Sequence, residues 1–446
     1  MRSRLPKVLH PVCGRPLLHH VIEAARRAAA KRIICVLGAE ADRVQESLSD
    51  MPVEIAIQEE RLGTGHAVLQ TRDLLKDHQG AVAILNGDLP LLTAASIERL
   101  VTSLETEKSD LSILTAEHPE SSDFGRLVRD GNGRIQRIVE YHDATPEQRQ
   151  IREVNVGAYA LDAGLLFRTL DQVGNDNPKG EYYLTNIVQL ILADGGSVSA
   201  AAVDEKGESE GVNSRADLAR AEMALQRRIA EYWMLQGVTI ENPAATYIGA
   251  DVTIGNDSVL GAGVNLRGKT RVGSGCRIDA GSFIEDSTIG DNAWIKPGCV
   301  IEESHFGADC VTGPNAHFRP NSVLSDGCRV GNFVEVKNSS LGAGTKADHL
   351  SYIGDADIGS GVTFACGAIT VNYDGRQKQR TTIGDGAFIG CNANLIAPVV
   401  IESQGYVAAG STITDGVPPR ALAVARQRQR NIEGWWDKHF GDDSDD

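Results

Sequence analysis

The sequence predicts an α/β, Rossmann-like domain followed by a parallel β-helix built from hexapeptide repeats. Two patterns carry this prediction. Short apolar runs alternate with helical patterns in the first half, and an aliphatic residue returns every six positions in the second half. The composition agrees, because 47 glycines suit a solenoid with many turns. A chain of 446 residues also exceeds what one ordinary hydrophobic core serves.

The six-residue rhythm runs through residues 248–413, with one interruption after Thr370. A helix repeats every 3.6 residues and a half-buried strand every two, so neither produces this period. A coil with three flat faces does, with one hexapeptide per face and its aliphatic side chain pointing inward. At three hexapeptides per coil, the segment makes roughly nine stacked coils.

The first half contains apolar runs at residues 32–37, 81–85, 111–115 and 154–160, with helical patterns such as 19–30 and 95–105 between them. Strands that alternate with helices predict a largely parallel sheet, with ligands beyond the carboxyl ends of the strands. Asp88 comes directly after the second run, so its carboxylate is expected to face that crevice, although Gly87-Asp88 also fits a plain turn.

Charge and cysteine usage limit the function. The net charge of −16 argues against a nucleic-acid partner or an anionic membrane surface. No apolar run reaches the length of a membrane span and no signal segment begins the chain, so a cytoplasmic protein is expected. The eight cysteines lack C-x-x-C spacing. Four of them lie four residues after a repeat aliphatic, in the small-residue slot, where other repeats have a small side chain. These four are predicted to be inert: Cys276, Cys299, Cys310 and Cys328.

Two short segments of the first half suit a bound nucleotide. Residues 58–66 read Q-E-E-R-L-G-T-G-H, where Gly-Thr-Gly lets backbone amides approach a ligand. Lys7 lies between apolar residues in L-P-K-V-L-H. Taken singly, the first is also compatible with an ordinary loop and the second with a solvated lysine.

In combination these segments resemble the sugar-1-phosphate nucleotidylyltransferases, and within them the bifunctional enzymes that form UDP-N-acetylglucosamine. The motifs occur in the family order along nearly the whole chain: L-P-K-V-L-H, L-G-T-G-H-A, N-G-D-L-P-L-L, F-G-R, I-V-E-Y, N-V-G, G-E-Y-Y-L-T-N and E-G-V-N-S-R. The resemblance implies a uridylyltransferase (pyrophosphorylase) in the first domain and an acetyltransferase on a left-handed β-helix in the second.

For the first domain, the resemblance implies a set of ligand contacts. Lys7 and Gln58 would contact the nucleotide, and Gly63 and Thr64 would lie near the uracil. Asp88 and Asn213 would hold Mg²⁺. The residues that would contact the sugar are Gly125, Glu140 and Asn155. A hard cation and a lysine suit this reaction, because attack on the α-phosphorus of UTP brings anions together.

One departure concerns the start of the chain. The family begins with a strand and the Gly-rich loop L-A-A-G-x-G-T-R-M, and Met1-Arg2-Ser3 aligns with the end of that motif. We therefore expect the strand, the phosphate-binding loop and its arginine to be missing. Either the start lies at an internal methionine, or the uridylyl half has lost its reaction.

The predicted organisation is a uridylyltransferase domain at 1–213, a linker helix at 214–237, an acetyltransferase domain at 238–425 and a C-terminal arm with an acidic tail at 426–446. Ser214 with Asp217 three residues later predicts the start of the linker helix.

Polar departures from the hexapeptide pattern cluster between residues 319 and 372. Arg319 and Lys337 are 18 residues apart, which places them at the same corner of adjacent coils and suits a phosphate. The resemblance implies His349 as the general base, oriented by Glu335. It also implies that glucosamine-1-phosphate would be held by Arg319, Lys337, Tyr352 and Asn372.

Acetyl-CoA would contact Cys366, Tyr373, Cys391, Ala409 and Arg426 by the same resemblance. Cys366 and Cys391 stand where many members have Ala and Ser, and Thr363 replaces a usual Asn, which removes one expected sugar contact. Related transferases are homotrimers with acetyl-transfer sites between subunits.

These observations predict a bifunctional enzyme that uses acetyl-CoA, UTP and Mg²⁺. One alternative retains only the acetyltransferase, and another is a non-catalytic hexapeptide scaffold. A metal site formed by His305, His317 and His349 is disfavoured, because they follow their aliphatics by different intervals.

Overall fold

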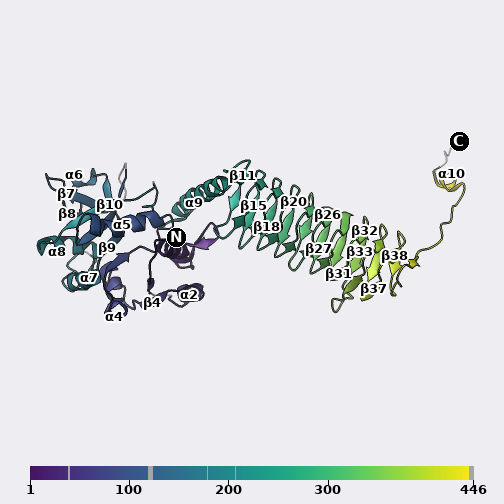
Figure 1. The fold of residues 1–446 in the computed structure, drawn as a ribbon, viewed down its shortest axis with the longest axis horizontal. Helices are drawn as coiled ribbons and strands as arrows, with labels where there is room; N and C mark the ends of the chain where they lie inside the picture. The colour runs from purple at the N-terminus through teal and green to yellow at the C-terminus, as the bar shows by residue number, and fades with distance from the viewer. Residues whose placement is uncertain (39–40, 119–123, 178, 206, 441–446) are drawn as a thin grey trace, which may run out of the picture. The chain divides into compact units, whose positions relative to one another are not determined.

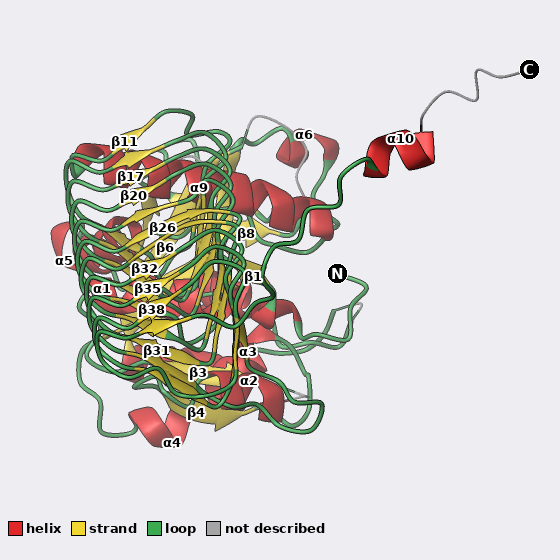
Figure 2. Cartoon of the chain, turned by 90° about the vertical axis from the view of Figure 1, so that its right-hand side faces the viewer, coloured by secondary structure: helices red, strands yellow, loops and turns green. Residues whose placement is uncertain are grey.

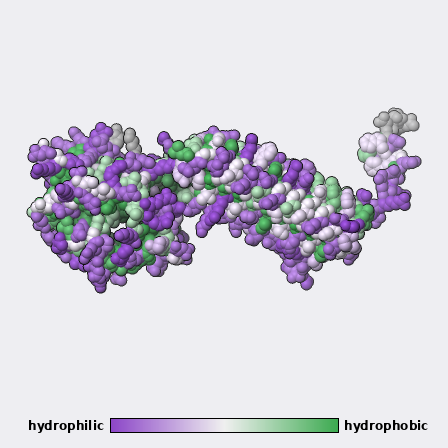
Figure 3. All heavy atoms as spheres, viewed as in Figure 1, coloured by the Kyte–Doolittle hydropathy of each residue, from purple (hydrophilic) through white to green (hydrophobic). Residues whose placement is uncertain are grey.

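The computed structural model describes residues 1–38, 41–118, 124–177, 179–205 and 207–440. The chain forms two compact units, Met1–Arg228 and Ile229–Asp446 (Figure 1). The acidic tail expected at residues 442–446 lies outside the described residues. Within the described part of the chain, no helix is long and apolar enough to cross a membrane. Hydrophilic residues dominate the face of both units seen in Figure 3.

The first unit contains a six-stranded sheet in the order β10–β6–β9–β7–β8, with β5 also paired to β9. Strand β9 runs antiparallel to β5, β6 and β7, and among the described strands of this sheet only β6 and β10 pair in parallel. The prediction of a largely parallel sheet is therefore wrong for the hydrogen-bonded pairs, because β9 is inserted between strands that share one direction. The strands are β5 (Ala81–Ile84), β6 (Leu111–Glu117), β7 (Arg126–Arg129), β8 (Ile135–Val139), β9 (Glu153–Asp162) and β10 (Val198–Ala202).

Two smaller sheets and a set of helices complete this unit. Strands β3 (Ile34–Leu37) and β4 (Glu54–Ile57) pair in parallel as a separate sheet, and β1 (Pro11–Val12) and β2 (Arg15–Pro16) form a hairpin. The helical segments are η1 (Lys7–Leu9), α1 (Leu17–Arg27), α2 (Ala41–Ser47), α3 (Thr64–Leu69), α4 (Arg72–Leu75), α5 (Ala94–Thr106), α6 (Pro146–Arg149), α7 (Ala163–Leu170), η2 (Leu184–Asn186) and α8 (Ile187–Ala193). Helix α9 (Arg215–Leu235) begins in this unit and ends after the boundary at Arg228.

Helix α9 begins with the reciprocal cap expected from the sequence. Asp217 N donates to Ser214 Oγ at 3.2 Å, and Ser214 N donates to Asp217 Oδ2 at 2.7 Å. Each bond satisfies a backbone donor near the start of the helix.

The second unit is a left-handed parallel β-helix, as predicted, and its stacked coils are seen in Figure 2. Each strand pairs in parallel with an equivalent strand of the next coil, which forms three faces. Face 1 contains β11 (Thr239–Ile240), β14 (Val259–Leu260), β17 (Arg277–Ile278), β20 (Trp294–Ile295), β23 (Val311–Thr312), β26 (Arg329–Asn332), β29 (Lys346–His349), β32 (Thr363–Phe364), β35 (Phe388–Ile389), β38 (Tyr406–Val407) and β40 (Leu422–Ala423).

Face 2 contains β12 (Tyr247–Ile248), β15 (Asn265–Arg267), β18 (Phe283–Glu285), β21 (Val300–Glu302), β24 (His317–Phe318), β27 (Glu335–Lys337), β30 (Tyr352–Gly354), β33 (Ile369–Val371), β36 (Asn394–Ile396) and β39 (Thr412–Ile413). Face 3 contains β13 (Thr253–Ile254), β16 (Arg271–Val272), β19 (Thr288–Ile289), β22 (His305–Phe306), β25 (Val323–Leu324), β28 (Ser340–Leu341), β31 (Ala356–Ile358), β34 (Thr381–Ile383) and β37 (Val399–Ile401). Helix α10 (Trp435–Phe440) follows the solenoid along the chain.

The repeat aliphatics form the core of the solenoid. Ile248 pairs with Leu266, and Leu266 with Ile284, and all three side chains are fully buried. The four cysteines of the small-residue slot are buried as predicted, whereas Cys366 and Cys391 are exposed. The phase breaks where the sequence indicated, because a loop at residues 372–380 separates β33 from β34.

Candidate active sites

In the first unit, Lys7 lies between the two predicted metal ligands, Asp88 and Asn213. Its Nζ atom is 2.6 Å from Asp88 Oδ2 and 2.8 Å from Asn213 Oδ1. Asp88 follows β5, and its carbonyl oxygen accepts a hydrogen bond from Val212 N, which holds the segment of Asn213 beside it. The structure thus brings together three residues that are far apart in the sequence.

The oxygen atoms of Asp88 and Asn213 suit a hard cation such as Mg²⁺. Mg²⁺ usually takes one or two protein ligands and completes its shell with water and substrate phosphates. Among the described residues, no group of three or more His, Cys, Asp or Glu side chains forms a metal cage. A cation here would therefore depend on oxygen atoms from the substrate.

The loop that carries Gly63 and Thr64 packs against Tyr182 of the G-E-Y-Y motif. Gly63 has a φ of +108°, and a Cβ atom there would lie 2.7 Å from the Tyr182 carbonyl oxygen. Thr64 Oγ1 accepts from Leu184 N at 3.0 Å, and Gln58 Nε2 donates to the Gly63 carbonyl at 3.1 Å. The Gly-Thr-Gly sequence is thus required for close packing of two loops, a structural role that the sequence did not indicate.

The three predicted sugar contacts form a second group at strand ends. The carbonyl of Gly125 accepts from Asn155 N at 2.9 Å. A Cβ atom at Gly125 would lie 3.6 Å from Glu140 Oε2. Burial raises the pKa of the Glu140 carboxyl, opposed by a hydrogen bond from Thr185. Asn155 Nδ2 donates to the hydroxyl of Tyr159 at 2.7 Å, and burial raises the pKa of that phenol.

A second glycine links this group to the loop of Asp88. Gly157 has a φ of +82°, and a Cβ atom there would meet Asn86 Nδ2 at 2.4 Å. Asn86 precedes Asp88 by two residues, and Gly157 follows Asn155 by two. The metal-ligand loop and the sugar-contact strand therefore touch through these two residues.

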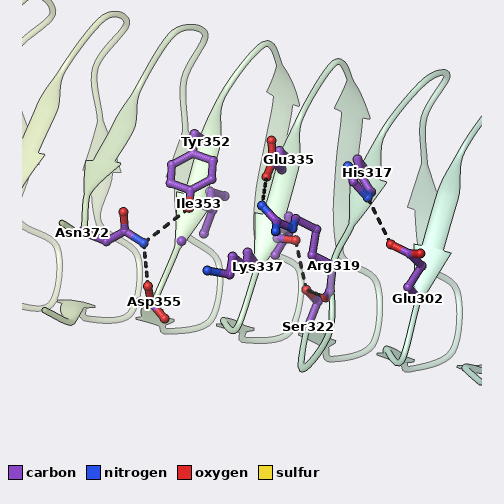
Figure 4. A network of polar contacts seen from close by, with 12 residues as sticks. Glu302, His317, Arg319, Ser322, Glu335, Lys337, Tyr352, Ile353, Asp355 and Asn372 are labelled. Atoms are coloured by element: carbon purple, nitrogen blue, oxygen red, sulfur yellow. Dashed lines mark hydrogen bonds and ion pairs between the residues drawn. The ribbon is translucent and has the colours of Figure 1, made fainter. Parts of the chain in front are cut away.

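In the second unit, face 2 carries the predicted phosphate contacts (Figure 4). Phe318 pairs with Val336, so Arg319 and Lys337 follow at equivalent positions of adjacent coils, as predicted. Lys378 joins them from the loop after β33, and its contact with Lys337 lowers the pKa of the Lys337 ammonium. Cations held this close form a site for a multiply charged anion. The sequence did not single out Lys378, although the interrupting loop contains three cationic residues.

Tyr352 and Asn372 meet beside these cations. Asn372 Nδ2 donates to Tyr352 Oη at 3.3 Å and to Asp355 Oδ2 (Figure 4). Although burial opposes it, hydrogen bonds from Asn338 and Asn372 hold the pKa of Asp355 below its usual value. A Cβ atom at Gly354 would lie 2.4 Å from Tyr352 Oη, so glycine lets the phenol lie across the face.

His349 lies at the end of β29, at the corner between faces 1 and 2. Its Nδ1 atom is 3.0 Å from Asn332 Oδ1, and the two residues pair directly in the face 1 ladder. Glu335 instead accepts from Arg319 Nη1 at 3.1 Å on face 2. The orienting role expected for Glu335 stays a prediction, and the register of this structure places Asn332 opposite the imidazole.

The predicted acetyl-CoA residues continue from His349 along the same corner. Strand pairs Lys346–Thr363, Thr363–Phe388 and Phe388–Tyr406 fix the register of the following coils. The residues two positions after each inward side chain then stack in one line, the His349 column: Asn332, His349, Cys366, Cys391 and Ala409. Four of these five were predicted as site residues from the sequence, His349 as the base and the other three as acetyl-CoA contacts, whereas Asn332 was not.

Two further predicted contacts lie at the edges of these surfaces. Tyr373 is 58% exposed and forms a β-bridge with Lys378. Arg426 Cδ lies 4.0 Å from the Cβ position of Gly410, next to the end of the His349 column.

The two other histidines considered for a metal site lie apart from His349. His305 and His317 lie on faces 3 and 2, and His317 Nε2 contacts Glu302 Oε2 at 3.3 Å.

The chain is similar to several known proteins. Residues 2–234 match the model of a nucleotidyl transferase family, described as "Nucleotidyl transferase". The "Bifunctional protein GlmU" of Geobacillus thermodenitrificans is 47% identical over 99% of this chain and 96% of its own length. The protein of the same name from Halalkalibacterium halodurans is 46% identical over 97% of this chain and 95% of its own length. A solved structure of UDP-glucose pyrophosphorylase complexed with UDP-glucose overlaps with a TM-score of 0.41 and 16% identity, covering 50% of this chain and 91% of that one.

The fold and these matches define a two-part transferase with a nucleotidyl transferase domain before a hexapeptide β-helix. The chain belongs to the family of bifunctional GlmU proteins, which confirms the predicted combination of acetyltransferase and uridylyltransferase.

Proposed function

We propose that this enzyme acetylates glucosamine-1-phosphate with acetyl-CoA and then transfers UMP from UTP to the product. The second reaction gives UDP-N-acetylglucosamine and pyrophosphate. UDP-N-acetylglucosamine is a precursor for bacterial cell-wall synthesis. The observation that carries the acetyltransferase assignment is the His349 column, which joins an imidazole to an exposed line of residues along successive coils.

For acetyl transfer, His349 acts as the general base. The free nitrogen of its imidazole can take the proton lost as the amine of glucosamine attacks the thioester carbon. Asn332 accepts from Nδ1–H, which leaves Nε2 as the basic nitrogen. Arg319, Lys337 and Lys378 hold the phosphate, and Tyr352 and Asn372 contact the sugar. Acetyl-CoA lies along Cys366, Cys391 and Ala409, with Tyr373 and Arg426 at its edges.

For uridylyl transfer, Asp88 and Asn213 hold Mg²⁺ and Lys7 contacts the nucleotide phosphates. When bound, the cation offsets the charge of the two anions that must meet at the α-phosphorus. Gln58, Gly63 and Thr64 contact the nucleotide base, and Gly125, Glu140 and Asn155 contact N-acetylglucosamine-1-phosphate.

The proposal includes a cytoplasmic homotrimer, with an acetyl-transfer site completed between subunits. The flat faces of the solenoid are compatible with side-by-side packing of copies. Domain limits at residues 213, 237 and 425 belong to the same proposal.

The test is the variant His349→Ala, assayed for both half-reactions on one preparation. Loss of a general base costs about 10²–10⁴ in rate, so release of CoA thiol is expected to fall by that factor. Uridylyl transfer from UTP is expected to stay within twofold, and the mass in solution to remain that of wild type. Near-normal thiol release by this variant would contradict the assignment of the base.

A further inference from the structure

Cys366 and Cys391 stack at one position of adjacent coils and are both exposed. Thr363 pairs with Phe388 and Phe364 with Ile389, and each cysteine follows its buried residue by two positions. Asn392 N donates to the Cys366 carbonyl at 2.9 Å, which continues the same register past the strand ends. Both thiols are free.

The stacking places these residues within reach of a covalent bond. Neighbouring strands lie about 4.8 Å apart, and a disulfide joins residues whose Cα atoms are about 4.4–6.8 Å apart. Because the two side chains are in register and leave the same corner of the solenoid, both sulfur atoms meet the same solvent.

A second cysteine pair in this chain shows what burial changes. Cys310 and Cys328 also stack on adjacent coils, since Val311 pairs with Arg329 directly after them. Both are fully buried, and burial raises the pKa of the Cys310 thiol to about 11 and also raises that of Cys328. The thiolate is the reactive form, so this inner pair is chemically inert.

We propose that Cys366 and Cys391 form a redox-sensitive dithiol site that closes to an intramolecular disulfide when it meets a small-molecule disulfide. One cysteine thiolate attacks the reagent, forms a mixed disulfide and releases one thiol. The second thiolate then attacks the protein sulfur of that mixed disulfide and releases the other thiol. Two protein thiols are oxidised, and one external disulfide is reduced to two thiols.

The consequence for activity rests on the proposed function. Cys366 and Cys391 are the middle members of the His349 column, between the base and Ala409. A bond between them draws their side chains together along the path proposed for acetyl-CoA. Oxidation would therefore stop acetyl transfer, and a dithiol reductant would restore it.

The experiment treats the fully reduced, intact chain with oxidised glutathione, followed by denaturation, alkylation and mass analysis. All but two of the eight cysteines are expected to be alkylated, and a peptide map is expected to join Cys366 to Cys391. The variant Cys391→Ser is expected to give a single glutathione adduct on Cys366 instead of the internal bond. Separate adducts on both cysteines of the unsubstituted chain, a bond between two chains on a non-reducing gel, or a bond between Cys310 and Cys328 would overturn the proposal.

The two half-reactions distinguish this inference from the proposed function. We expect oxidation to lower acetyl transfer at least tenfold and dithiothreitol to restore it, while uridylyl transfer by the same sample is unchanged. Formation of the bond without loss of acetyl transfer would support the dithiol site and contradict the proposed path of acetyl-CoA.

Discussion

His349 Nδ1 lies 3.0 Å from Asn332 Oδ1 across two adjacent coils of face 1. An amide oxygen only accepts hydrogen bonds, so Nδ1 carries the proton and Nε2 has its lone pair free. Because Asn332 is neutral, it fixes the orientation of the ring without adding the charge that a carboxylate would.

Two substitutions of Asn332 separate orientation from charge. Asn332→Ala removes one neutral hydrogen bond worth about 0.5–1.5 kcal/mol, so kcat for acetyl transfer is expected to fall about 2- to 12-fold. Asn332→Asp places a carboxylate beside the ring, and a nearby negative charge favours the protonated form of an imidazole. The base must be neutral to accept a proton, so the acidic limb of kcat/KM would move to higher pH.

Asn292→Asp is the matched control, since it adds the same charge at a corner where Asp309 occupies the equivalent position of the next coil. Its pH profile is expected to match that of the unsubstituted enzyme. An unshifted profile for Asn332→Asp would mean that Asn332 does not act through His349.

The cation cluster on face 2 is expected to determine affinity for the sugar phosphate. Replacement of Arg319, Lys337 or Lys378 by Ala removes a charge-assisted hydrogen bond of about 1.5–3 kcal/mol, which corresponds to a rise in KM for glucosamine-1-phosphate of about 10- to 150-fold. The KM for acetyl-CoA would change less than twofold.

Arg376→Ala removes a cation from the same loop and serves as the control, with both KM values unchanged. Lys378→Ala should also raise the pKa of Lys337, because the contact that lowers it is gone. The alkaline loss of kcat/KM then begins at higher pH. A rise in the KM for acetyl-CoA alone would assign the cluster to the other substrate.

Gly63→Ala is expected to destabilise the first unit. The position has a φ of +108°, and the new methyl group would lie 2.7 Å from a backbone oxygen and 2.8 Å from a backbone nitrogen of Tyr182. Strain of this kind costs about 1–3 kcal/mol, and heat inactivation of uridylyl transfer measures it. Gly80→Ala is the control, because Gly80 has a φ of +115° with no atom within 4 Å. Equal losses in the two variants would mean that contact with Tyr182 is unimportant.

Glu140→Gln is expected to increase stability while weakening sugar binding. Burial raises the pKa of Glu140 in the folded state above the usual value of a glutamate, so folding stability is lost as pH rises from the unfolded-state pKa through the folded-state pKa. A neutral amide avoids this cost, and the variant should melt at a higher temperature than the unsubstituted protein at pH 8. Well below the unfolded-state pKa the carboxyl is protonated in both states, so the difference disappears.

Loss of the carboxylate acceptor should raise the KM for N-acetylglucosamine-1-phosphate. A lower melting temperature at pH 8 would show that contacts to the carboxylate outweigh its burial.

The hexapeptide rhythm predicted the solenoid well because each six-residue step has one structural meaning. The same rhythm correctly predicted that Arg319 and Lys337 occupy equivalent positions of adjacent coils, since both follow an inward residue by one position. It did not reveal the pairing of His349 with Asn332, because the two residues are 17 positions apart and so depart from the 18-residue step of the ideal coil. Lys378 was missed for a related reason, since the loop that carries it has no repeat phase from which to infer direction.

The α/β unit was harder to predict in detail. Apolar runs identified its main strands, but a run carries no information on strand direction, and β9 turned out to lie antiparallel between strands of one orientation. The Gly-Thr-Gly segment suggested a ligand loop, whereas the requirement for Gly63 comes from Tyr182, over a hundred residues later in the chain. Such requirements depend on tertiary contacts and leave no local pattern.

Because equivalent positions pair from coil to coil, the second unit can change length in whole turns. Every residue proposed for acetyl transfer, in the cation cluster of face 2 and in the His349 column, lies at or after Arg319. Removing one whole turn from the early part of the solenoid, such as residues 255–272, should preserve the phase of all later coils. Removing a single residue there should turn the inward side chains outward from that point until the phase recovers. Evolution can therefore shorten or lengthen this spacer in whole turns without redesigning the site.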